Sequence, residues 1–112
     1  MSKRHAPPRW QRFEPQAEVI QGLAHPIRLA VAELLRDGET CVCDIAASIG
    51  AERSNVSRHL AVMLKSGIVQ TRKQGLKVYY SLRTPCILDF LRCATRTLEQ
   101  DLALRKRALA TA

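Results

Sequence analysis

Apolar residues in the first third of the chain recur at the spacing of amphipathic α-helices. Pro26 suits the first turn of a helix, where its missing N–H costs nothing. After it, apolar residues fall at i, i+3, i+4, i+7 and i+8: Ile27, Ala30, Val31, Leu34 and Leu35. We predict a helix that begins at Pro26 and ends at Asp37–Gly38, preceded by a shorter helix from Pro15 to about Ala24.

Two further short helices and a β-hairpin are predicted downstream. An extended segment, Glu39 to Val42, precedes a helix from Cys43 to Ile49 that Gly50 closes. Ser54 is a good N-cap for the next helix, which stops at Gly67 and carries four inward apolar residues, Val56, Leu60, Met63 and Leu64. β-rich runs at 68–72 and 76–82 flank a turn at 73–75, and Thr84–Pro85 opens a last helix of about 20 residues.

This order of elements predicts a winged helix-turn-helix, a mainly α fold with a small β-hairpin wing. The tight turn at Gly50–Arg53 joins the two short helices, and the hairpin follows them. Apolar residues of the last helix cover more than one stripe, so we expect it to form a helical interface between two copies of the chain. The predicted organisation is a mobile basic arm (1–14), the dimeric winged domain (15–107) and a C-terminal tail (108–112).

Size and composition limit the possible functions. A chain of 112 residues forms one small domain, which excludes large multi-domain enzymes. It has no run of 18 apolar residues and no apolar segment after its basic N-terminus, so we expect neither a membrane span nor a signal peptide, and a cytoplasmic location.

The charge is positive and unevenly distributed, which indicates a nucleic-acid partner. The formal net charge is +8, and the segment from Arg53 to Leu88 holds seven basic residues and no Asp or Glu. In a winged helix-turn-helix the second helix of the pair enters the major groove of double-stranded DNA, and the wing lies over the adjacent backbone or minor groove. We therefore predict DNA contacts from Arg53, Ser54, Asn55, Ser57, Arg58, Arg72, Lys73 and Lys77, whereas His25 and His59 are predicted to be structural.

Four cysteines suggest disulfides, a metal site or buried thiols, and a reducing compartment disfavours the disulfides. Residues two apart on a strand share a face, so Cys41 and Cys43 are expected to converge. If the short strand pairs near Leu82, Cys86 lies close to both. Cys93 shares a helix stripe with Cys86 but lies ~10 Å further along the axis, so we predict it as a fourth or substitute ligand.

Several segments resemble the ArsR/SmtB family of metal- and metalloid-responsive repressors, over about residues 17–100. The resemblance rests on Leu23-Ala-His-Pro-Ile-Arg-Leu29, Ser54-Asn-Val-Ser-Arg-His-Leu60, Ser66-Gly-Ile-Val69, and Gly75 with Val78-Tyr-Tyr-Ser-Leu82. Cys41-Val-Cys-Asp-Ile45 looks like the arsenic-sensing box of that family, although Ala46 and Ala47 stand where the best-known box has a third cysteine. The resemblance implies a homodimer that binds an inverted-repeat operator without ligand and is released when ligand binds.

The thiol chemistry leaves several inducers open. Three thiolates suit As(III) or Sb(III), and four suit Cd(II), Pb(II) or Zn(II). A ligand that joins Cys41, Cys43 and Cys86 would fix the angle between the DNA-reading helices and the dimer helix. The alternatives are a repressor that senses thiol oxidation or persulfides, and a small arsenate reductase or phosphatase that uses the Cys-x5-Arg match at Cys86–Arg92. The five residues between Cys86 and Arg92 are apolar except for Asp89, whose negative charge would repel an anion. We therefore take the match as a coincidence and predict no enzyme activity.

Overall fold

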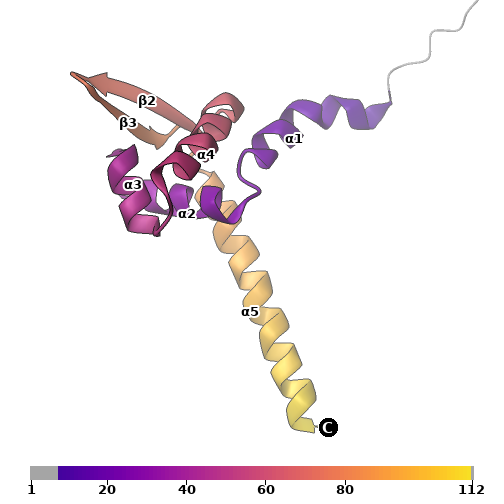
Figure 1. The fold of residues 1–112 in the computed structure, drawn as a ribbon. Helices are drawn as coiled ribbons and strands as arrows, with labels where there is room; N and C mark the ends of the chain where they lie inside the picture. Colours follow the sequence, from indigo (N-terminus) through magenta and orange to yellow (C-terminus); the bar gives the residue numbers. More distant parts are fainter. Residues whose placement is uncertain (1–7, 112) are drawn as a thin grey trace, which may run out of the picture.

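The computed structural model describes residues 8–111, and it confirms the winged helix-turn-helix (Figure 1). Its elements run in the order η1 (Arg9–Phe13), α1 (Glu14–Gln21), α2 (Pro26–Leu35), β1 (Thr40–Cys41), α3 (Val42–Ile49), α4 (Arg53–Ser66), β2 (Val69–Gln74), β3 (Lys77–Leu82) and α5 (Ile87–Thr111). The helix pair α3–α4 turns at Gly50, whose φ of 70° is the left-handed conformation that glycine adopts without strain.

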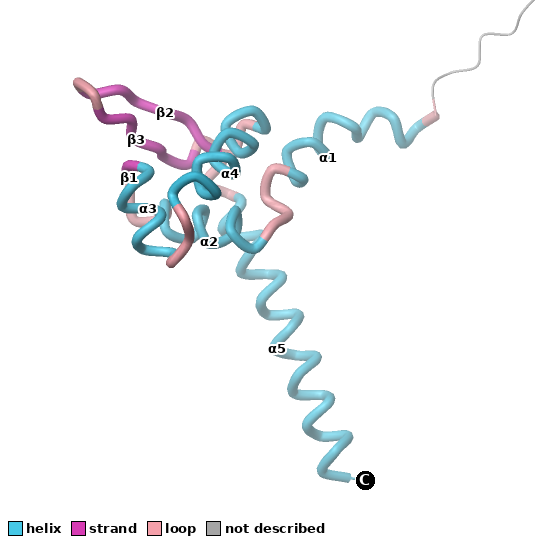
Figure 2. The backbone as a smooth tube through the Cα atoms, in the orientation of Figure 1, coloured by secondary structure: helices cyan, strands magenta, loops and turns pink. Residues whose placement is uncertain are grey.

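The three strands form one antiparallel sheet in the order β1-β3-β2 (Figure 2). The wing hairpin pairs in register from Val69↔Leu82 to Gln74↔Lys77. Its turn therefore lies at Gly75–Leu76 rather than at 73–75 as predicted, so Lys73 and Gln74 belong to β2 and Leu76 belongs to the turn. The short strand pairs with β3 as predicted, but at Thr40↔Tyr80 and Cys41↔Tyr79 instead of near Leu82.

The hydrophobic core lies where α2, α3 and α4 meet the base of the wing. On α4, Val56, Leu60 and Met63 are completely buried, as their i, i+4, i+7 spacing predicts. Leu64 was predicted to be buried with them, yet 43% of its surface is exposed. It follows Met63 directly, so its side chain points away from the buried face of the helix. Other buried members come from all neighbouring elements: Leu23, Val31, Ala32, Leu35, Ile45, Ala46, Ile68, Val69 and Ile87.

Several helix boundaries differ from the prediction. α4 begins at Arg53 with Glu52 in the N-cap position, so Ser54 lies within the helix and is not its cap. α3 begins at Val42, which places Cys43 in the first turn of a helix rather than on a strand. A turn at Pro85–Cys86 precedes α5, and the carbonyls of Thr84 and Pro85 accept hydrogen bonds from the N–H groups of Ile87 and Leu88.

The two ends of the described chain extend away from the core. The radius of gyration is 19.0 Å, against about 13 Å for a compact chain of this length. Figure 1 shows α5 projecting from one side of the body and α1 with η1 from another. Residues 1–7 of the predicted arm lie outside the described residues, and 9–14 are helical rather than irregular. The helix α5 continues to Thr111, past the boundary predicted at 107. No helix within 8–111 is long and apolar enough to cross a membrane.

Truncation of α4 core residues tests this packing. We expect Leu60→Ala to lower the free energy of unfolding by about 2–5 kcal/mol, because it leaves a cavity in a fully buried position. Leu64→Ala on the same helix removes the same atoms from a half-exposed position and should cost about 1 kcal/mol or less. Urea unfolding followed by circular dichroism measures both, and equal losses would contradict the placement of Leu64 at the rim.

Candidate nucleic-acid interface and thiol cavity

The outer face of α4 carries hydrogen-bond donors that no other element covers. Its inner apolar residues fix the helix on the core, which leaves Arg53, Ser54, Ser57 and Arg58 exposed at its N-terminal half. Asn55 is half-buried and accepts a hydrogen bond from Arg58 Nη2 at 2.8 Å. This contact holds the guanidinium of Arg58 beside the helix, next to Asn55.

The wing adds basic residues, but one of them is engaged within the chain. Lys73 and Lys77 are exposed at the end of the hairpin. Arg72, in contrast, donates from Nε and Nη2 to the two carboxylate oxygens of Glu39, at 3.0 and 2.5 Å, and from Nη1 to Gln74. Its guanidinium carbon also lies 5.1 Å from the ring centre of Tyr79. These hydrogen bonds lower the pKa of Glu39.

The pairing of Arg72 gives it a contact within the chain beside its predicted one with DNA. The pair is exposed, at 51% and 40% of the two side chains, so it costs little free energy to open. It joins the wing to the loop before β1, next to Cys41. Sequence reasoning missed Glu39, because the two residues are 33 positions apart and no periodic pattern relates them.

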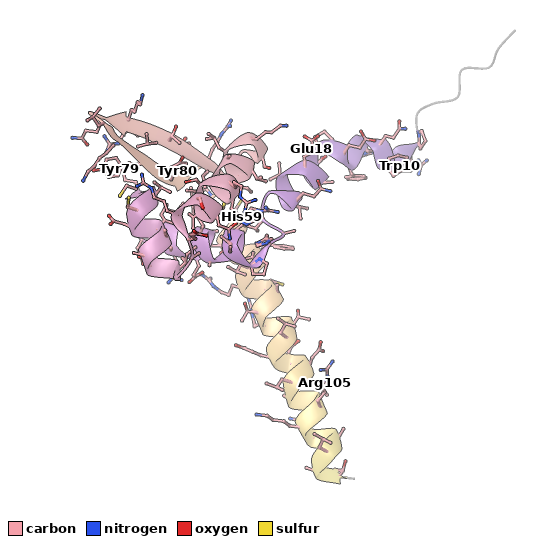
Figure 3. The ribbon with its side chains drawn as sticks, viewed as in Figure 1. Trp10, Glu18, His59, Tyr79, Tyr80 and Arg105 are labelled. Carbon is pink, nitrogen blue, oxygen red and sulfur yellow. The ribbon has the colours of Figure 1, made fainter. Side chains whose placement is uncertain are left out.

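A histidine–arginine cluster joins α4 to the start of α2. His25 is the N-cap of α2, and its Nδ1 accepts from the N–H of Ile27 at 3.1 Å. The rings of His25 and His59 are 4.1 Å apart between centres. Arg28 Nη1 lies 3.1 Å from His59 Nδ1, and since a guanidinium has no acceptor, the imidazole nitrogen must accept. Both histidines are therefore structural, as predicted, and Figure 3 shows His59 among the packed helices.

Cys41 and Cys43 line one cavity of about 390 Å³ between the start of α3, the start of α4 and the wing. The Sγ of Cys41 donates to a carboxylate oxygen of Asp44 at 3.3 Å. The cavity walls also include two predicted DNA-contacting residues, Arg53 and Lys77. The lining also includes Val42 of α3 and three residues of the wing, Leu76, Val78 and Tyr80. Figure 3 shows Tyr79 and Tyr80 on β3 beside the start of α3.

The cysteines of the C-terminal segment do not join this pair within one chain. Cys86 lies in the turn before α5 and Cys93 on α5, and all four thiols are free. Over residues 8–111, no three His, Cys, Asp or Glu side chains gather closely enough to hold a metal ion. The predicted Cys41–Cys43–Cys86 cluster is therefore wrong for a single chain. The physical reason is the sheet register, which pairs Cys41 with Tyr79, about 10 Å further from Cys86 than a pairing at Leu82.

The Cys-x5-Arg match from Cys86 to Arg92 has no anion-binding geometry. Residues 87–92 belong to α5, and the N–H of Asp89 already bonds the carbonyl of Cys86. The N–H groups of Ile87 and Leu88 are likewise bonded, to the carbonyls of Thr84 and Pro85, so none of the three is turned inward around an oxyanion. The match is a coincidence of spacing, as predicted.

An apolar surface runs from α1 and α2 onto α5. A groove between these elements is lined without a single charged residue, by Ile20, Leu23, Ala24, Leu29, Phe90, Leu91 and Ala94. Further along α5, four leucines are more than half exposed to solvent in the single chain: Leu98, Leu102, Leu104 and Leu109. Apolar surface of this extent marks an interaction site.

Comparison with known proteins agrees with this geometry. Residues 25–71 match the family described as "Bacterial regulatory protein, arsR family". The chain is 34% identical over 98 residues to the uncharacterized HTH-type transcriptional regulator Rv0081 of Mycobacterium tuberculosis, which covers 87% of this chain and 86% of that protein. The crystal structure of Rv0081 superimposes with a TM-score of 0.71 at 31% identity, over 90% of this chain and 98% of that one.

Two shorter matches carry more specific descriptions. The arsenical resistance operon repressor of Escherichia coli is 43% identical over 66 residues, 58% of this chain and 56% of that protein. A cadmium resistance transcriptional regulatory protein CadC homolog of Staphylococcus aureus is 40% identical over 67 residues, 59% and 55% of the two chains. The fold and these matches define a winged-helix transcriptional regulator. The chain belongs to the ArsR family, whose members are DNA-binding regulators and not enzymes.

The histidine cluster predicts a pH dependence of stability. Burial lowers the pKa of His59, and the neighbouring His25, Arg28 and Arg58 lower it further. The folded protein therefore holds His59 neutral, so its contribution is complete above the unfolded pKa of about 6.5 and is lost as the pH falls below it. We expect the urea midpoint to fall between pH 7.5 and 5.5, and to fall less in His59→Gln, which keeps an acceptor but does not titrate. An identical fall in both proteins would show that His59 is not the source.

Proposed function

We propose that this regulator is a homodimeric repressor that binds an inverted-repeat operator without ligand and is released by As(III) or Sb(III) bound to cysteine thiolates. The observation that carries the proposal is the cavity in which Cys41 and Cys43 lie with Arg53 and Lys77. The two thiols that would bind the ion therefore line the same cavity as two residues that we predict to contact DNA. The proposed site of action is the cytoplasm, where thiols stay reduced.

The DNA-binding half of the proposal rests on α4 and the wing. In this arrangement Arg53 and Arg58 approach base edges or phosphates of the major groove, with Ser54, Asn55 and Ser57 beside them. Lys73 and Lys77 contribute affinity that depends on salt rather than on sequence. Arg72 contributes in the same way once its exposed pair with Glu39 opens.

The dimeric half rests on the apolar surface of α1, α2 and α5. A second copy of the same surface is its simplest cover, because a twofold axis lets one patch bury itself. One of the solved winged-helix structures that this fold resembles is described as homodimeric, at a TM-score of 0.72. A twofold dimer places two recognition helices about one helical turn of DNA apart, which is the basis of the inverted repeat.

Release follows from where the thiols lie. Cys41 ends β1, which pairs with β3 of the wing, and Cys43 lies in the first turn of α3. A ligand that joins them therefore fixes the start of α3 relative to the strand that pairs with the wing. The proposed consequence is a shift of the wing relative to α4, which then no longer fits the operator. A coupling free energy of about 1–3 kcal/mol corresponds to a 5- to 150-fold loss of DNA affinity. Cys86 and Cys93 stay candidate ligands only if a second subunit brings them to this cavity.

Substitution on α4 tests the DNA contact. We expect Arg58→Ala to weaken binding to the protein's own promoter DNA by about 1–3 kcal/mol, because a guanidinium–DNA contact is lost. The control is Arg36→Ala, which removes the same charge from a position that shares a cavity with Leu88 and Arg92 of α5. Fluorescence anisotropy at fixed salt measures both. Equal affinities for the two variants would refute the placement of α4 on DNA.

Removal of a single thiol tests the inducer site. Cys41→Ser should bind promoter DNA as the wild type does but should need at least about tenfold more As(III) for release, because one thiolate is missing. Cys93→Ser is measured in parallel, because it shows whether a thiol on α5 of a second subunit also contributes to release. Titration in excess thiol-free reductant follows DNA release. Normal release of the Cys41→Ser protein would exclude Cys41 from the mechanism.

Two alternatives use the same thiols. A Cd(II)-, Pb(II)- or Zn(II)-responsive repressor is favoured by the similarity to the CadC homolog. A repressor that senses oxidation or persulfides needs only two neighbouring free thiols, which this cavity also supplies. Release by a thiophilic ion in full reductant, reversed by a chelating dithiol, separates ion sensing from redox sensing.

A further inference from the structure

The guanidinium of Arg58 is held by a neighbouring side chain of the same helix. Its Nη2 donates to Oδ1 of Asn55 at 2.8 Å, three positions earlier on α4. Arg58 is exposed and Asn55 is half-buried, so the exposed group is attached to the less mobile one. Among residues 8–111 no carboxylate forms an ion pair with Arg58, unlike Arg72, which pairs with Glu39. The positive charge of Arg58 therefore remains available to a ligand.

Asn55 belongs to a part of α4 that is fixed on the body of the protein. Val56 follows it directly and is completely buried. One helical turn later, Nδ1 of His59 accepts from Arg28 of α2 at 3.1 Å. The backbone at Asn55 is thus anchored on two sides, and its short side chain offers Arg58 an acceptor at a fixed place.

The hydrogen bond to Asn55 leaves most donors of Arg58 free. A guanidinium has five N–H donors in one plane. Nε with Nη2 forms one two-donor edge, and Nη1 with Nη2 forms the other. Each hydrogen of Nη2 belongs to a different edge, so one complete edge stays free whichever hydrogen Asn55 binds. Such an edge matches the O6 and N7 acceptors that guanine presents in the major groove.

Asn55 is the other candidate base reader at this place. An asparagine recognises adenine with both ends of its amide, since Oδ1 accepts from N6 and the NH₂ group donates to N7. In this structure Oδ1 already accepts from Arg58. The amide is therefore oriented toward Arg58, and the two side chains together favour guanine over adenine.

We propose that Arg58 reads a guanine in each half-site of the operator and that Asn55 is a positioning residue that holds its guanidinium for this contact. The inference rests on the proposed function and specifies the base that α4 recognises. An arginine loses rotamer freedom when it binds, and a neighbour that restricts it beforehand reduces that loss. Asn55 thus contributes to specificity through Arg58, without a base contact of its own.

The test uses the reduced full chain and its own promoter DNA, in which single guanines are replaced by 7-deazaguanine or by inosine. 7-Deazaguanine lacks the N7 acceptor, whereas inosine keeps O6 and N7 and lacks only the amino group in the minor groove. We expect one guanine per half-site at which 7-deazaguanine binds about three- to tenfold more weakly than inosine. Fluorescence anisotropy at fixed salt gives this ratio of affinities.

Three variants assign the effect to the two side chains. Arg58→Lys keeps the charge but has no planar fork, so the ratio at this guanine should fall close to one. Asn55→Ala lacks the acceptor and should lower the ratio by at least about twofold, because Arg58 is no longer held. Asn55→Asp keeps an acceptor oxygen and should retain the wild-type ratio, while its negative charge weakens binding to all DNA. The urea midpoint of each variant checks that it folds.

The outcomes separate this inference from the proposed function. A ratio near one at every guanine of the promoter overturns the inference and leaves the proposed repressor intact. An unchanged ratio in Asn55→Ala overturns the positioning role of Asn55. Failure of the wild-type protein to bind its promoter overturns the proposed function, and the inference with it.

Discussion

The structure depends on the complete burial of one face of α4. Val56, Leu60 and Met63 are sealed against α2, α3 and the base of the wing, so the rotation of this helix about its own axis is fixed. That rotation determines which side chains of α4 are exposed on its opposite face. Arg53, Ser57 and Arg58 are exposed because the core residues are not, and a chain of this size has no second core that could hold the helix in another orientation.

Periodicity along the chain was enough to predict the order of the helices, the glycine-closed turn and the hairpin wing. It failed where a boundary depends on a tertiary contact. The strand β1 has two residues because only Thr40 and Cys41 find partners on β3, and the helix starts directly after them, at Val42. The predicted same-face geometry of Cys41 and Cys43 was therefore wrong. The two thiols share a cavity for another reason, the junction of strand and helix.

The candidate site was predictable in its residue types but not in its pairings. Charge segregation indicated the basic face of α4 and the wing. No local pattern links Arg72 to Glu39 or Arg28 to His59, which are 33 and 31 positions apart and meet only in the folded chain. The sequence already departs from the arsenic box that it resembles, because Ala46 and Ala47 stand where the best-known box has a third cysteine. The register of β1 on β3 shows why Cys86 does not supply it within one chain.

The ion pair between Arg72 and Glu39 bears on the salt dependence of DNA binding. Arg72 must open this exposed pair before it can neutralise a phosphate, and opening costs little free energy. Each neutralised phosphate contributes about 0.9 to the slope of log K against log salt. A subunit whose pair stays closed on DNA therefore has a slope shallower by about that amount than a subunit whose pair opens.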